Sequence, residues 1–147
     1  MYSFLKNVHS GWAYLVILVL VLAFVASFIA RISNKPYSAI HFRLALFGLI
    51  TTHLQLLIGF VLYFVSPYFE NWSSGMGGVM KNSEIRLYIV EHPLTMIIAV
   101  VLITIGYSKH KKALTSKSKL MRIALFYGIG LVLLLSRIPW KTWLNAN

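Results

Sequence analysis

Long apolar segments alternate with short polar ones along the whole chain. Four of these segments approach the length of about 20 residues that an α-helix needs to cross a bilayer, although the fourth apolar run is the shortest. With their flanks, they predict membrane-crossing helices at about 10–31, 42–66, 84–108 and 120–138. The connections that remain are short. We therefore expect one domain, residues 1–147, folded as an all-α integral membrane four-helix bundle.

The amino-acid composition excludes an ordinary soluble domain. The chain is 59% apolar and 12% charged, whereas about 25% charged residues are typical of soluble proteins. The first apolar run is longer than the hydrophobic region of a secretory signal, so we expect it to be a true first helix. Cysteine and aspartate are absent, as are an acid pair suited to hydrolysis and a nucleotide-binding glycine motif. An autonomous enzyme is therefore not expected.

Charged residues are sorted by connection. The net charge is +11, and nine of the fourteen cations flank the first and third connections: Arg31, Lys35, Arg43, Lys109, Lys111, Lys112, Lys117, Lys119 and Arg122. The other side holds all three acids and the four tryptophans, which prefer membrane interfaces: Glu70, Glu84, Glu91, Trp12, Trp72, Trp140 and Trp143. The positive-inside rule then predicts that both termini face outward, which in a bacterial inner (cytoplasmic) membrane is the periplasmic side. The basic charge indicates orientation and contact with anionic lipid, not nucleic-acid binding.

Small and polar residues form one stripe on each of the two middle helices. At 100° per residue, the stripe on the second helix contains Ala45, Gly48, Thr52, Gln55, Gly59 and Tyr63, and that on the third contains Tyr88, His92, Thr95, Ala99 and Gly106. Such stripes allow membrane helices to approach closely. His53 lies about 110° away from the stripe on its helix. Its ring can therefore face the interior of the bundle or another subunit.

Two histidines lie inside predicted crossings, His53 in the second and His92 in the third. An ionisable group at this depth is costly without a partner, so both are candidate functional residues. A structural explanation is an interhelical hydrogen bond, for example to Gln55, Thr95 or a carbonyl that Pro93 leaves free. The functional explanation is metal ligation, because imidazole is the commonest metal-binding side chain and cofactors of helical bundles lie between facing helices. A b-type haem with two histidine ligands would satisfy both rings.

Depth along upright helices leaves the choice of ligand pair open. His92 is expected roughly 6–10 Å deeper than His9, and His53 roughly 16–20 Å deep. We expect His53 and His92 to be the pair, because both lie within the hydrocarbon, and we keep His9 as the alternative ligand. Helix tilt or a kink must bring either pair together. His41 and His110 lie among cations and are expected to be solvated or in contact with lipid.

Glu91 and Arg137 form a second candidate constellation at the outer ends of the third and fourth helices. An ion pair between them would neutralise a carboxylate that is otherwise costly at this depth. In a functional version, Arg137, with Arg86, would bind haem propionates while Glu91 orients an imidazole or relays protons.

Four segments carry a resemblance to a known family. HSGWAYL, THLQLLIGFVLYFVSP, RLYIVEHPLTMIIAVVLITIGYSKHKK and LLLSRIPW resemble small bacterial four-helix membrane proteins commonly labelled cytochrome b-like, over nearly the whole chain. The resemblance implies a b-type haem with ligands among His9, His53 and His92.

Three functions are consistent with these features. The first is a haem b-binding electron-transfer or quinone-linked subunit of a larger membrane complex. The second is a cofactor-free accessory subunit that packs against other membrane subunits or a second copy of the chain. The third is a small transporter or proton relay that uses Glu91, His92 and His53.

Overall fold

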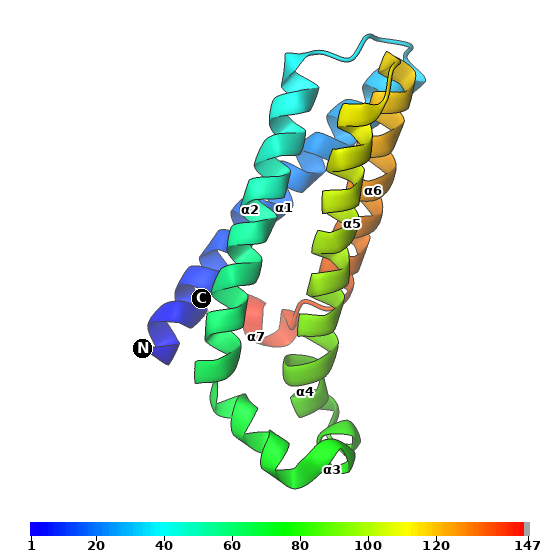
Figure 1. The fold of residues 1–147 in the computed structure, drawn as a ribbon. Helices are drawn as coiled ribbons and strands as arrows, with labels where there is room; N and C mark the ends of the chain where they lie inside the picture. Colours follow the sequence, from blue (N-terminus) through cyan, green and yellow to red (C-terminus); the bar gives the residue numbers. More distant parts are fainter. Residues whose placement is uncertain (146–147) are drawn as a thin grey trace.

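Four long helices form the bundle in this computed structural model, which describes residues 1–145 (Figure 1). All four are long and apolar enough to cross a membrane, and the third crossing is a continuous helical stretch made of three elements. In chain order the elements are α1 (Tyr2–Ile32), α2 (Ala39–Val65), the 3₁₀ helix η1 (Pro67–Ser74), α3 (Gly75–Lys81), α4 (Ser83–Arg86), the π-helical turn η2 (Leu87–Glu91), α5 (His92–Lys112), α6 (Ser116–Ser136) and α7 (Trp140–Leu144). The predicted all-α membrane four-helix bundle is confirmed.

Helix boundaries differ from the predicted ones chiefly at the start of the chain. The sequence predicts a start near residue 10, but α1 begins at Tyr2 and so carries Lys6 and His9 on the helix. The polar residues in this stretch lower its hydropathy without preventing a helix. All other ends lie within four residues of the prediction. The third crossing starts as expected, because Asn82 Oδ1 accepts two backbone hydrogen bonds of 3.1 Å from the first turn of α4.

The four crossings form a closed ring in the order α1, α2, α5 and α6, with the core at its centre. The Tyr127 ring of α6 is fully buried on Gly48 of α2, where an added Cβ atom would lie 2.8 Å from the ring. Its hydroxyl donates a hydrogen bond of 2.5 Å to the Ala45 carbonyl. Ala45, Gly48 and Thr52 are all buried. The small-residue stripe predicted on the second helix is therefore an inward face.

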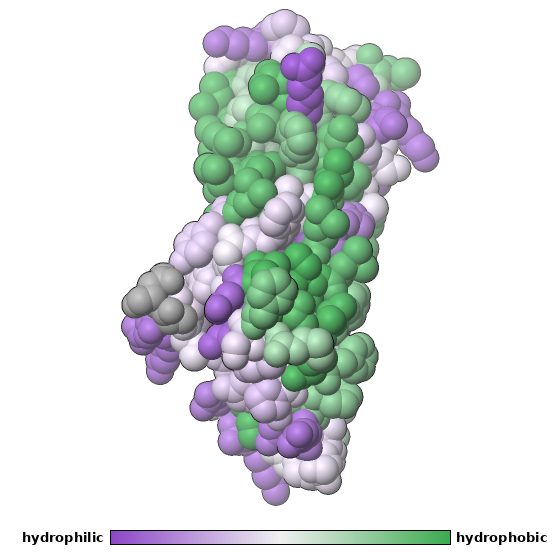
Figure 2. All heavy atoms as spheres, turned by 90° about the vertical axis from the view of Figure 1, so that its left-hand side faces the viewer, coloured by the Kyte–Doolittle hydropathy of each residue, from purple (hydrophilic) through white to green (hydrophobic). Residues whose placement is uncertain are grey.

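Large apolar side chains cover the outside of the ring. Leu18, Leu57, Ile98 and Val132, one from each crossing, are all exposed. Figure 2 shows a largely apolar surface in the upper half of the face that it displays, below hydrophilic residues at the top, and a mixture of apolar and hydrophilic residues in the lower half. Such a surface suits a bundle with lipid around its middle, because lipid is the solvent in which exposed apolar side chains cost nothing.

The two ends of the bundle differ in what they hold. The connections 33–38 and 113–115 lie at one end, which we call the basic end (Figure 1). The N-terminus, η1 and α3 lie at the other end, which we call the pocket end (Figure 1). The short helix α7 follows α6 and turns back across the bundle near the pocket end (Figure 1).

Two histidines at the basic end are buried, which corrects the prediction that they contact solvent or lipid. His110 Nδ1 donates to the Tyr107 carbonyl at 2.7 Å, and its Nε2 accepts from the Tyr37 hydroxyl at 3.1 Å. Burial, with a further contribution from Tyr107, raises the pKa of Tyr37, so this phenol keeps the proton that it donates. His41 Nδ1 accepts from the Ser38 backbone N–H at 3.0 Å. The first connection thus folds back over both rings, which hydropathy does not predict.

Candidate functional site

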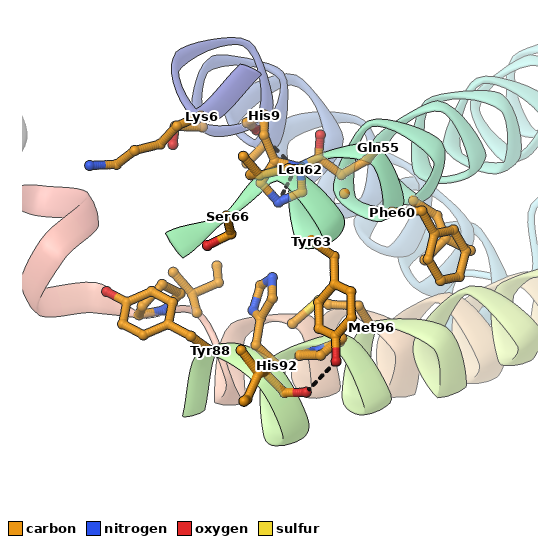
Figure 3. Close-up of a pocket in the computed structure, with 18 of the residues that line it drawn as sticks. Lys6, His9, Gln55, Phe60, Leu62, Tyr63, Ser66, Tyr88, His92 and Met96 are labelled. Carbon is orange, nitrogen blue, oxygen red and sulfur yellow. Dashed lines mark hydrogen bonds between the residues drawn. The ribbon is translucent and has the colours of Figure 1, made fainter. Parts of the chain in front are cut away.

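A cavity of about 570 Å³ opens between α1, α2 and the third crossing at the pocket end (Figure 3). Its volume lies in the range of about 300–1,000 Å³ that is usual for small-molecule sites. Residues of α7 line one side of the cavity, so the C-terminal segment also takes part in enclosing it. A second cavity, beside His53 and Thr104, has a volume of about 320 Å³.

Two histidine rings face each other across this cavity, His9 from α1 and His92 from the start of α5 (Figure 3). Their centroids lie 6.2 Å apart and their planes are inclined by 77°. A metal bound to one nitrogen of each ring, with bonds of about 2 Å, would hold the ring centres roughly 6 Å apart. The observed separation of 6.2 Å is close to that spacing.

The His92 ring is oriented by the backbone of another helix. Its Nδ1 lies 2.8 Å from the Arg137 carbonyl oxygen, which can only accept, so Nδ1 carries the proton. Arg137 follows the end of α6 and its carbonyl lies outside the helix, which leaves that oxygen available. With Nδ1 protonated, a neutral ring keeps its lone pair on Nε2. A hydrogen bond from one nitrogen that prepares the other is the usual arrangement of a metal-binding histidine.

The His9 ring fits against a glycine on α2 and has a single long hydrogen bond. A Cβ atom at Gly59 would lie 3.1 Å from His9 Cε1, so the glycine leaves room for the ring. Gln55 Nε2 donates to the His9 carbonyl at 2.9 Å and lies 3.5 Å from His9 Nε2, the outer limit of a hydrogen bond. His9 Nδ1 and Gln55 Oε1 are buried without a partner among the described residues. Each such atom costs about 1–3 kcal/mol, so the described residues leave this part of the site incompletely hydrogen-bonded.

A hydrogen-bonded pair of aromatic residues forms the wall of the cavity beyond the histidines. Pro93 has no N–H, so it cannot donate to the Ile89 carbonyl, four residues earlier. The Tyr63 hydroxyl of α2 donates to that carbonyl at 3.2 Å, and the Trp72 indole of η1 donates to the same hydroxyl at 2.9 Å. That carbonyl thus ties α2 and η1 to the third crossing.

The C-terminal segment joins the two helices that carry the histidines. Trp143 Nε1 donates to the carbonyl of Ser10, the residue after His9, at 3.3 Å, and its ring stacks on Tyr14 at 4.5 Å between centroids. On the other side, Thr142 Oγ1 is hydrogen-bonded to the Tyr88 hydroxyl. Together with the Arg137 carbonyl, these contacts fix the segment after α6 to both sides of the cavity.

Glu91 holds two arginines beside the site but outside the cavity wall. The predicted ion pair is present, with Arg137 Nε 3.4 Å from Glu91 Oε2, and Arg86 Nε lies 2.6 Å from Glu91 Oε1. All three side chains are about one-third exposed or more, so these pairs contribute little to stability. Neither arginine is among the residues that line the cavity. A propionate-binding role for Arg137 or Arg86 stays a prediction that their positions do not favour.

The structure does not bring His53 and His92 together. His53 is exposed on the outside of α2, where Nδ1 lies 2.7 Å from the Leu49 carbonyl and Nε2 lies 3.4 Å from Thr104 Oγ1. Thr104 follows His92 by twelve residues, or about 18 Å of helix. The ring that lies beside His92 is that of His9, the alternative ligand of the sequence analysis.

Sequence reasoning did not identify two residues of the site. Lys6 lines the cavity, and its spacing of three residues from His9 would have placed both on one face of a helix had the helix been predicted to begin earlier. Trp143 also lines the cavity, but no local pattern indicates that the chain after α6 turns back toward α1.

The histidine pair suits a metal that brings further ligands of its own. Among residues 1–145, no group of three or more His, Cys, Asp or Glu side chains could hold a bare metal ion. Haem iron needs only axial ligands from the protein, because its porphyrin supplies the others.

Comparisons of the chain with models of protein families, with curated proteins and with solved structures find no match.

Proposed function

We propose that this protein binds a b-type haem between His9 and His92 and serves as an electron-transfer or quinone-linked subunit of a membrane complex. The observation that carries the proposal is the pair of facing imidazoles, 6.2 Å apart, in a cavity of ligand size. Bound haem would supply one-electron redox chemistry. The chain would supply the two axial nitrogens, the orientation of the rings and the environment around them.

The residues around the pair fit such a group. The cavity wall beyond the rings is apolar, formed in part by Leu56, Phe60 and Val100, and a haem needs an apolar environment for its macrocycle. His92 is already oriented through Nδ1. His9 Nδ1 is buried, and Nε2 has a single long contact of 3.5 Å with Gln55, so Nε2 would be the ligating nitrogen.

The location of the site follows from the charge pattern. The cavity lies at the pocket end, opposite the connections that carry most cations. With those cations on the cytoplasmic side of a bacterial inner membrane, the pair would lie in the outer half of the bilayer. A quinone or a redox subunit that exchanges electrons with this site would therefore approach from that side.

The test is a reduced-minus-oxidised absorption spectrum of protein purified from its native membrane with haem supplied. We expect the sharp α band of a low-spin b-type haem in the wild type. His9→Leu and His92→Leu should each abolish the low-spin band, whereas His53→Leu, the matched control on the outside of α2, should retain it. Complete absence of haem from the wild type would reject the proposal. A band that survives both ligand substitutions would reject the ligand assignment.

A stable stoichiometric complex without pigment would instead favour a cofactor-free accessory subunit. In that case the facing rings and the cavity would be a packing feature completed by a neighbouring subunit. The spectrum and the composition of the purified complex thus separate the two functions in one preparation.

A further inference from the structure

A lysine, a serine and a tyrosine lie together on one side of the histidine pair. Figure 3 shows Lys6, Ser66 and Tyr88 on one side of the two rings, with Phe60 on the opposite side. Gln55 and Tyr63 lie toward Phe60, but neither carries a charge (Figure 3). An anionic ligand in this cavity therefore finds its countercharge on the side of Lys6.

Helical spacing explains why these polar groups lie at one level. Lys6 precedes His9 by three residues on α1, and Tyr88 precedes His92 by four residues on the third crossing. Residues three or four apart lie on the same face of a helix, one turn from each other. Both polar residues are therefore displaced from the ligand pair by one turn in the direction of the pocket end.

Lys6 is the cation that this wall offers to an anionic ligand. Among the cavity-lining residues, all of which belong to the described part of the chain, it is the single lysine or arginine. The two ion pairs found within residues 1–145 both use Glu91, and neither includes Lys6. Glu91 instead holds Arg86 and Arg137, which do not line the cavity. A lysine that is partly buried beside such a cavity gains most from an anion supplied by the ligand.

We propose that Lys6 binds a carboxylate of the cavity ligand, so that a haem in this site turns its propionates toward Lys6 and Tyr88. The inference rests on the haem-binding proposal and deepens it. In this assignment the propionates are bound by Lys6 on α1, and not by the two arginines that pair with Glu91. The ammonium group acts in two ways: it adds affinity for the carboxylate, and it neutralises part of the negative charge next to the iron.

Titration with two forms of the ligand tests this assignment. Purified full-length protein is titrated with haem b and with haem b dimethyl ester, which lacks the carboxylate charges. We expect the wild type to bind the diacid about tenfold more tightly, the lower end of the effect of a charge-assisted hydrogen bond at a partly exposed site. Lys6→Met should reduce that preference to less than about twofold without weakening the ester, and Lys6→Arg should retain most of it.

Lys81→Met is the matched control, because Lys81 is an exposed lysine on α3 that does not line the cavity. It should keep the full preference for the diacid. The midpoint potential of bound haem gives a second readout: Lys6→Met should lower it, because loss of a nearby cation favours the more positively charged ferric state, whereas Lys81→Met should leave it unchanged.

The outcomes separate this inference from the proposed function. If Lys6→Met binds both forms but keeps the tenfold preference for the diacid, Lys6 does not hold the carboxylate, and its ammonium group is left to lipid phosphates at the interface. If the wild type binds neither form, the haem proposal itself fails and the assignment of Lys6 fails with it.

Discussion

Removal of the Tyr63 hydroxyl should destabilise the pocket end, because this hydroxyl is the hydrogen-bond donor to the Ile89 carbonyl. Tyr63 donates to the Ile89 carbonyl at 3.2 Å, and Pro93 cannot donate to it. The same hydroxyl accepts from the Trp72 indole at 2.9 Å. Tyr63→Phe therefore leaves one acceptor and one donor unpaired while it keeps the ring in place.

The expected magnitude follows from these two bonds. Hydrogen bonds between membrane helices contribute about 0.6 kcal/mol on average and at most about 1.7 kcal/mol. Loss of two bonds should therefore lower the free energy of unfolding by about 1–3 kcal/mol. The measurement is reversible unfolding in mixed micelles, followed by far-UV circular dichroism. Tyr14→Phe is the control, since its hydroxyl makes no hydrogen bond within residues 1–145 and its ring is exposed; it should change stability by less than about 0.5 kcal/mol.

A double-mutant cycle with Pro93→Ala isolates the carbonyl. Alanine restores an N–H four residues after Ile89, which can donate to that carbonyl. In the Pro93→Ala background, Tyr63→Phe should therefore lower the free energy of unfolding only through the lost Trp72 bond, by about half of its effect in the wild type. Equal costs in the two backgrounds would show that Tyr63 does not act through this carbonyl. No cost in either background would refute the reasoning about both bonds.

Three further changes test the packing around the site. Gly48→Ala should cost about 1–3 kcal/mol in the same unfolding assay, because its Cβ atom would lie 2.8 Å from the buried Tyr127 ring; an unchanged stability would mean that the ring moves freely. Gly59→Ala presses on His9 Cε1 at 3.1 Å and should weaken haem binding severalfold while the free energy of unfolding falls by less than about 1 kcal/mol, so equal haem affinity would argue against His9 as a ligand. Trp143→Phe removes the bond to the Ser10 carbonyl and should shift the potential of bound haem without abolishing the low-spin band; an unshifted potential would show that α7 does not position His9.

Local rules predict most of the fold of this chain. The four crossings follow from apolar length alone, because the bilayer leaves helices as the way to pair every backbone group of a single apolar segment. The Asn82 cap, the carbonyl to which Pro93 cannot donate and the Glu91–Arg137 pair also follow from residue types and spacing. Each of these features depends on residues close in sequence or on helix ends at the same membrane surface.

The choice of histidine partner depends on how helices tilt, which no local pattern specifies. Counting depth along upright helices separates His9 from His92, but α1 is inclined to its neighbours (Figure 1) and begins early enough to carry His9 to the level of α5. The direction in which His53 points does follow from its place on the helix. Its position about 110° away from the small-residue stripe corresponds to the exposed outside of α2 in the structure.

The same geometry bears on a proton relay through Glu91, His92 and His53. A relay needs neighbouring groups within hydrogen-bond reach, or bridging water, along its whole length. Glu91 accepts from Arg86 and Arg137, His92 Nδ1 donates to a backbone carbonyl, and His53 contacts the third crossing about 18 Å further along the helix. Between them the wall is apolar, with Ile97 and Val100 lining the cavity. His53 therefore lies beyond hydrogen-bond reach of Glu91 and His92, and these two residues between them offer no polar group to carry a proton, so the described contacts argue against a relay through these three side chains.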